Sequence, residues 1–313
     1  MHFLARGKLI DITRFVIGVS YVLLGKPLLS RDLTTFVFHE ISDVPNRHAR
    51  ETHTFSNVAL FRKQITWIKA AFPIVDLRRN GSNELTSGCV LSFDDGYAGV
   101  LKNALPILEE YQVPAICFIN MATILGEINS SALAMFIADR NGVGVKWHDS
   151  NPRFFDETLG VLEENELQEV REYQGPYLTA EELELLSKSA LISLGDHSYN
   201  HWLLDALDHD GLSYEVRRSR TKLKEYSEIA DIIAAPHAVA SDSTIYGLAE
   251  NGYRVLFSGK TFSRRGSIVV HPRIDMSNRI GNKYQFFGVV AIAKCRSKFS
   301  LKWPVKIDPH KAS

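Results

Sequence analysis

Two adjacent carboxylates, Asp94 and Asp95, lie in the run Leu91-Ser92-Phe93-Asp94-Asp95-Gly96-Tyr97. The apolar residues before them predict a buried strand, and Gly96 permits a tight turn directly after them. At the end of a strand, one carboxylate can act as a base while its neighbour holds a cation. An Asp-Asp-Gly turn that only caps a helix explains this run equally well when the run is taken alone.

Two histidines, His197 and His201, lie four positions apart after the apolar run Leu191-Ile192-Ser193-Leu194. They can face one point if the loop coils into a helical turn, and this spacing suits zinc. Taken alone, such a pair is more often structural than ligating. Together with Asp95 it offers two nitrogens and one oxygen, which leaves positions open for water and substrate, as in a catalytic zinc site.

The elements that must position these residues follow from the pattern of apolar runs. From Thr34 onward, short apolar runs alternate with segments of helical period, which indicates repeated β-α units and a parallel sheet. The strands that we expect are Thr34–Phe38, Cys89–Phe93, Ala115–Ile119, Leu191–Leu194, Ile232–Ala235 and Ser267–Val270. Asp94, Asp95 and both histidines follow strands, at the rim where β/α barrels collect their catalytic groups.

The chain of 313 residues falls within the size range of a single α/β barrel. We divide it into an N-terminal amphipathic segment at 1–30, a barrel at 31–285 and a C-terminal tail at 286–313. Residues at about 121–175 exceed an ordinary connection and are rich in Glu and Leu, so we expect a helical insertion there.

Charge and hydropathy exclude several classes of partner and location. Lys plus Arg and Asp plus Glu number 36 each, and without a long basic stretch we expect no nucleic-acid partner. The uncharged run Phe15–Gly25 is shorter than the roughly 20 residues that span a bilayer, and no signal-peptide cleavage site follows it. We therefore expect a cytoplasmic protein that touches the inner membrane peripherally through residues 8–25.

The motifs together resemble the polysaccharide deacetylase family, which is carbohydrate esterase family 4 or the NodB homology domain. Its Thr/Ser-Phe-Asp-Asp-Gly signature is matched by Ser92 to Gly96, and its His-Ser/Thr-x-x-His signature by His197 to His201. The resemblance runs from about Thr34 to Met276. It implies a distorted (β/α)7 barrel, Asp94 as the general base, and one divalent ion, zinc, held by Asp95, His197 and His201.

One family signature departs from the expected residues. The family's Arg-x-Pro-Tyr, whose arginine holds the catalytic carboxylate, is replaced here by Ala234-Ala235-Pro236-His237. Arg273 is a candidate to supply the missing charge from a neighbouring strand, and a purely structural arginine is the alternative. For His237 a structural or substrate-contacting role is favoured over a catalytic one.

The general acid has two histidine candidates. In much of the family this acid comes from the C-terminal end of the barrel, where His271 lies. However, Phe38-His39-Glu40-Ile41 resembles a subgroup with a Tyr/Phe-His-x-Ile first strand, in which the acid comes from that strand, so His39 is preferred. A histidine that only closes the strand end is the alternative. No motif surrounds His48, His53, His148 and His209, and we expect ordinary surface residues there.

The expected function is that of a metal-dependent hydrolase that removes acetyl groups from a carbohydrate or a surface polysaccharide precursor. N-acetyl is preferred over O-acetyl, so the bond broken is a carbon–nitrogen bond other than a peptide bond. Two alternatives stay open: a catalytically silent carbohydrate-binding relative, and a metal amidase with a non-carbohydrate substrate.

Overall fold

The computed structural model describes residues 2–23, 33–77, 87–143, 150–226 and 231–299. Its strands are β1 Thr34–Phe38, β2 Glu40–Ile41, β3 Phe55–Ser56, β4 Cys89–Phe93, β5 Ala115–Ile119, β6 Ile192–Asp196, β7 Ile232–Ala234, β8 Val255–Ser258, β9 Ser263–Arg265 and β10 Ile268–Asp275. Its α-helices are α1 His2–Leu23, α2 Arg47–Thr52, α3 Val58–Ala71, α5 Leu105–Tyr111, α6 Met121–Ile124, α7 Ser130–Arg140, α8 Pro152–Leu159, α9 Glu164–Gln174, α10 Ala180–Ser187, α11 His209–Leu223, α12 Asp242–Glu250 and α13 Lys283–Phe299. Short helical turns are η2 Val100–Ala104, η4 Leu204–Ala206 and η5 Pro236–Ala238.

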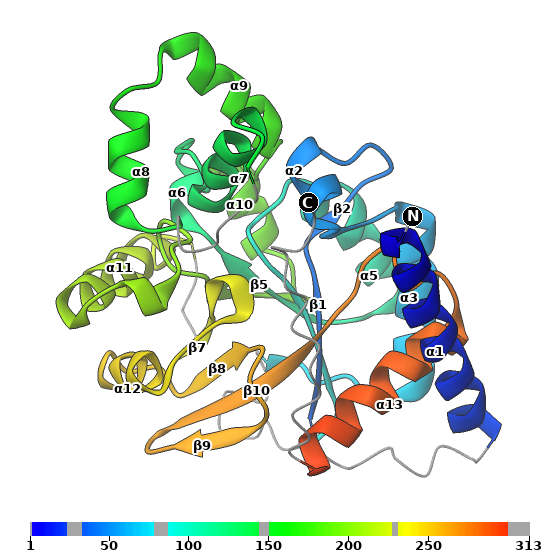
Figure 1. Cartoon of the computed structure of the whole chain (residues 1–313). Helices are drawn as coiled ribbons and strands as arrows, with labels where there is room; N and C mark the ends of the chain where they lie inside the picture. Colours follow the sequence, from blue (N-terminus) through cyan, green and yellow to red (C-terminus); the bar gives the residue numbers. More distant parts are fainter. Residues whose placement is uncertain (1, 24–32, 78–86, 144–149, 227–230, 300–313) are drawn as a thin grey trace.

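Seven parallel strands form a closed barrel. They follow one another in the order β1-β4-β5-β6-β7-β8-β10, and β10 pairs with β1 to complete the ring. The short strand β9 pairs antiparallel with β10. Helices surround the strands (Figure 1), which confirms the expected distorted (β/α)7 barrel.

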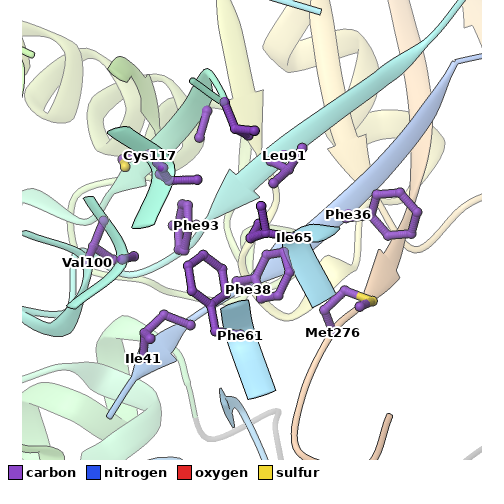
Figure 2. Packing of buried hydrophobic residues seen from close by; sticks show 14 of the residues in the cluster. Phe36, Phe38, Ile41, Phe61, Ile65, Leu91, Phe93, Val100, Cys117 and Met276 are labelled. Atoms are coloured by element: carbon purple, nitrogen blue, oxygen red, sulfur yellow. The ribbon is translucent and has the colours of Figure 1, made fainter. Parts of the chain in front are cut away.

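The strands alternate between two buried layers, because successive side chains point to opposite faces. On β1, Phe38 lies 5.6 Å from the ring of Phe93 on β4 and 5.1 Å from the ring of Phe61 on α3 (Figure 2). These rings belong to the layer between the barrel and its outer helices. Thr35 belongs to the opposite, interior face, where it pairs in register with Arg273 of β10.

Three expected strands, β1, β4 and β5, have the predicted bounds, and three others are shifted at their ends. β6 extends to Asp196, β7 ends at Ala234, and β10 continues to Asp275. The prediction missed β8, and also the short strands β2, β3 and β9. β8 has only four residues, and its pairing with β7 and β10 decides that it is a strand.

The expected insertion contains helices α6 to α9. Figure 1 shows α7, α8 and α9 grouped beyond the C-terminal end of β5, which is the end of the barrel where the motif residues lie. The insertion is tied to α2 by Arg47 Nη2, 2.7 Å from Asp139 Oδ2, and by Tyr173 Oη, which donates to Glu51 Oε2 at 2.6 Å. The insertion is therefore held at the end of the barrel where the motif residues lie.

The two ends of the described chain pack on each other as helices. Residues 2–23 of the predicted N-terminal segment form α1, which contacts α13. The prediction of a tail from residue 286 is wrong for 286–299, which form most of α13, because Phe286 and Val290 are fully buried against the barrel. Within the described residues, no helix is both long and apolar enough to cross a membrane.

Candidate active site

Asp94 and Asp95 leave the end of β4 in a turn that separates their two side chains. The Asp94 N–H donates to the carbonyl of Phe38 at 2.9 Å, so Asp94 continues the pairing between β4 and β1. Asp95 instead has a left-handed backbone, with φ of 72°. Both carboxylates are buried, with residue exposures of 2% and 7%.

Asp95, His197 and His201 form a compact cluster of ligand atoms. Asp95 Oδ1 lies 3.3 Å from His197 Nε2 and 3.2 Å from His201 Nε2. Atoms about 2.1 Å from one tetrahedral zinc ion lie about 3.4 Å from each other, so these separations fit such an ion. Asp95 Oδ1 is also buried without a hydrogen-bond donor. A cation bound to this oxygen would compensate its negative charge. The predicted ligand set therefore fits a divalent metal.

Hydrogen bonds behind the two histidines fix their orientation. His197 Nδ1 lies 2.9 Å from the carbonyl oxygen of Ala234 and donates to it, which leaves the Nε2 lone pair for the cluster. Asp196 Oδ1 accepts from the Ser198 N–H at 2.8 Å, and Glu215 Oε1 accepts from the Asn200 N–H at 2.6 Å. Two buried carboxylates thus hold the backbone of the loop that carries both ligands.

Left-handed backbone conformations are concentrated at this site. Such conformations cost a non-glycine residue about 1–3 kcal/mol and persist where surrounding contacts enforce them. Of the seven described non-glycine residues with positive φ, five lie here: Asp95, Ser198, His201, His237 and Ala238. The other two, His53 and Gln112, follow the C-terminal ends of α2 and α5. Strained backbone conformations are therefore concentrated at the site that the motif residues form.

Arg273 occupies the place of the missing arginine. Its Nη1 lies 2.6 Å from Asp94 Oδ1, and its side chain is 5% exposed. Burial alone raises the pKa of Asp94, but Arg273, with His197 and His39, holds that pKa below its ordinary value. Asp94 is therefore an ionised carboxylate, and its other oxygen, Oδ2, lies 3.6 Å from His197 Nε2.

Of the three candidate histidines, His39 and His237 are partly exposed and His271 is buried. His39 directly follows the pair Phe38–Phe93 in register, beside Asp94, and its Nδ1 is buried without a partner. His237 Nε2 lies 3.2 Å from Ser150 Oγ of the insertion, and its ring packs against that of His201 at 4.8 Å. His271 is 3% exposed, and burial lowers its pKa to about 4. Of the three, His39 is the histidine that lies beside Asp94, and it is partly exposed.

Two further polar residues at the site were missed or misplaced by the sequence analysis. Asp275 is exposed at the end of β10, paired in register with Val37, and interacts electrostatically with His39. Its spacing two positions after Arg273 is a signal that could have placed it on the same strand face. The prediction that His48 is a surface residue is wrong, because α2 turns it inward. His48 is 5% exposed, and its Nδ1 lies 3.2 Å from Tyr97 Oη.

The remaining histidines without a motif, His53, His148 and His209, were also expected at the surface. His209 is exposed as expected, with a side-chain exposure of 68%, and its Nε2 lies 3.1 Å from Glu250 Oε2. His53 is exposed as expected too. His148 lies outside the described residues.

Comparison with known proteins agrees with this geometry. Residues 83–256 match the model of the family described as Polysaccharide deacetylase. Because the match covers more than half of the sequence, the chain belongs to the polysaccharide deacetylase family. No curated protein matches the sequence.

Several solved structures share the fold at low sequence identity. The Streptococcus pyogenes deacetylase PplD in complex with acetate is 17% identical with a TM-score of 0.55, over 82% of this chain and 97% of that one. IcaB from Ammonifex degensii is 15% identical with a TM-score of 0.55, over 83% and 98%. BC0361, a polysaccharide deacetylase from Bacillus cereus, is 15% identical with a TM-score of 0.56, over 83% and 69%. At these identities the likeness concerns the fold.

Proposed function

We propose that the protein is a metal-dependent hydrolase that removes acetyl groups from a carbohydrate or a surface polysaccharide precursor, N-acetyl in preference to O-acetyl. One observation carries the proposal. Asp94 is held by Arg273 next to the cluster of Asp95, His197 and His201 without belonging to it. A base and a ligand set that are adjacent but separate are what a metal-assisted hydrolysis requires.

The divalent ion, zinc by its donor set of two imidazoles and one carboxylate, would be held by Asp95, His197 and His201. The chemistry supplied by such an ion is polarisation of the acetyl carbonyl and a greater acidity of the attacking water. The protein's own contribution is to fix the donors, since His197 is held by the Ala234 carbonyl and its loop by Asp196 and Glu215.

Asp94 takes a proton from the attacking water. Arg273 keeps this carboxylate ionised and pointed at the cluster, so it is ready as a base. The water oxygen bonds to the acetyl carbon, and the tetrahedral intermediate must then lose the sugar nitrogen instead of the added oxygen.

His39 gives a proton to that departing nitrogen as the carbon–nitrogen bond breaks. The products are acetate and a free amine, or an alcohol if the acetyl group is an ester. Histidine suits this role because it changes charge near neutral pH. Burial lowers the pKa of both His237 and His271 below the ordinary histidine value, which disfavours them as acids.

The absence of the family's arginine after β7 would favour the alternative of a catalytically silent carbohydrate-binding relative. With Arg273 against Asp94, the base has its positive partner from β10, and this supports the enzyme over a binding relative. A metal amidase with a non-carbohydrate substrate would use the same groups, so the substrate has to be tested directly.

Acetate release from N-acetylated oligosaccharides, O-acetylated oligosaccharides and simple acetamides tests the function. We expect release from the N-acetylated sugars with added zinc, loss after chelation, and none from the Asp94→Asn control. Release from acetamides alone would favour the amidase. No release from any substrate by zinc-loaded protein would favour the silent relative.

Metal content tests the ligand set separately. His197→Ala and His201→Ala should each lose stoichiometric zinc in elemental analysis, whereas His237→Ala, beside the cluster, should retain most of it. Full zinc in both ligand variants would refute the assignment.

A further inference from the structure

Helix α1 is fixed to the protein by one face. Its backbone approaches α13 so closely that a Cβ atom at Gly18 would overlap the Tyr284 carbonyl, and one at Gly288 would overlap the Arg14 carbonyl. Next to this crossing, the ring of Tyr21, 3% exposed, stacks on Phe287 at 6.0 Å. Figure 1 shows α1 and α13 side by side on one flank of the barrel. α1 is thus a docked helix whose other face has a defined direction.

Between residues 10 and 23, where side chains are described, the opposite face of α1 exposes large apolar residues. Ile12, Val16 and Leu23 have exposures of 59%, 55% and 79%, and their spacing of four and seven places them along one side of the helix. Two more exposed apolar residues lie nearer α13: Phe15, 42% exposed, has its ring 5.4 Å from that of Tyr284, and Ile10, 44% exposed, lies one turn before Arg14. Five large exposed hydrophobic residues thus fall between residues 10 and 23, compared with nine in all the rest of the described chain. A concentration of this kind on a soluble surface marks an interaction site.

The net charge of α1 and α13 indicates which kind of partner this face would bind. α1 and α13 together carry seven Lys or Arg and one Asp, a net charge of +6. Because the whole chain has 36 residues of each sign, the remainder carries −6. An apolar helix face on the positively charged part of a neutral protein complements an anionic lipid surface, which offers apolar chains and negative headgroups together.

We propose that the outer face of α1 docks the protein on an anionic bilayer surface, with the helix lying among the headgroups. No described helix is suited to cross the bilayer, so the contact is a peripheral one. A second copy of the chain is a poorer occupant, because each copy would bring two helices with a net charge of +6, and like charges repel. The inference is independent of the proposed hydrolysis.

Flotation of the full chain with vesicles tests the proposal. Vesicles of phosphatidylcholine with phosphatidylglycerol should bind the protein, vesicles of phosphatidylcholine alone should bind it weakly, and high salt should release it. The double variant Ile12→Ser/Val16→Ser removes apolar area without touching the active site and should bind at least about tenfold more weakly. Val44→Ser/Val161→Ser, at two residues exposed to 88% and 77% elsewhere, is the matched control and should bind like the wild type.

Several outcomes would overturn the proposal. It fails if the wild type does not float with anionic vesicles, or if the two double variants bind equally. It also fails if Ile12→Ser/Val16→Ser abolishes a concentration-dependent dimer instead, because a second copy would then be the occupant. Turnover of a soluble substrate should be the same in wild type and both variants, so a failure of docking is distinguishable from a failure of the proposed activity.

Discussion

Arg273 Nη1 lies 2.6 Å from Asp94 Oδ1, although 179 positions separate the two residues in the sequence. β1 lies between their strands, and the register aligns Arg273 with Thr35 and Thr35 with Val90. Arg273 is therefore further than Asp94 from the C-terminal end of the barrel strands. Its long side chain extends toward that end and reaches the carboxylate. A strand distant in sequence thus supplies the charge that the family takes from the segment after β7.

Removing that charge should impair catalysis without releasing the metal. We expect Arg273→Gln to lower kcat about ten- to a hundredfold, because a misplaced base is costly even when it is present. Arg273→Lys should recover part of the loss, since it keeps the charge but not the planar guanidinium that reaches Asp94. Steady-state kinetics with parallel zinc analysis checks this. Near-normal kcat in Arg273→Gln would make the arginine purely structural.

The two adjacent aspartates should respond differently to the same change. Asp94→Asn removes the base but no ligand, so we expect retained zinc and a kcat lower by roughly 10² to 10⁴-fold. Asp95→Asn should instead lose zinc, because its Oδ1 is the oxygen shared by both histidines. Zinc analysis and turnover of both variants decide the roles. The reverse pattern of metal loss would exchange them.

His39 should be needed for turnover but not for metal binding. We expect His39→Ala to retain zinc, to lose most of its kcat and to lose the high-pH limb of the rate profile, because the departing nitrogen has no proton donor. His237→Ala and His271→Ala serve as comparisons. If His39→Ala is nearly as active as wild type and one of the other two is inactive, the acid is that other histidine.

Gly195 should resist substitution because of what lies next to it. A Cβ atom there would be 2.6 Å from Cδ1 and Cε1 of Phe118, and the Phe118 ring lies 5.9 Å below the Arg273 guanidinium. We expect Gly195→Ala to lower the free energy of unfolding by about 1–3 kcal/mol through overpacking, and to reduce kcat by displacing Arg273. At Gly281 the nearest atom would be 3.7 Å from the new Cβ, so Gly281→Ala is the control for urea unfolding. Equal stability of the two variants would contradict the packing argument.

Glu40 should make stability depend on pH. Burial raises the pKa of Glu40 to about 7, against a partial opposing effect of the hydrogen bond from Asn46. A pKa raised on folding means that the folded state holds the proton more tightly, so the stability is full below about pH 4.5 and is lost as pH rises toward 7. The loss is up to about 3 kcal/mol.

Glu40→Gln should remove this dependence, because the amide oxygen still accepts from the Asn46 N–H and Nδ2, which lie 3.2 and 2.8 Å from Oε2. We expect the variant to be more stable than wild type at pH 8 and similar to it at pH 4.5 in urea unfolding. Parallel pH curves for the two proteins would show that Glu40 does not carry the effect.

Local sequence was sufficient for much of the barrel and for the two motifs. Apolar runs predicted β1, β4 and β5 with their bounds, because fully buried parallel strands need apolar residues on both faces. The motif residues could be placed at one rim because every parallel strand of a barrel ends on the same side. Asp95, His197 and His201 therefore meet as the sequence predicted, within 4.8 Å of one another.

Tertiary structure decided the features that depend on contacts between distant segments. β8 is a strand through its pairing with β7 and β10, and residues 286–299 are a helix whose apolar face the barrel buries. His48 is buried because α2 packs against the insertion, and nothing in its neighbouring residues indicates this. Arg273 meets Asp94 because closing the ring brings β10 beside β1, and closure is a property of the whole sheet that no local pattern contains.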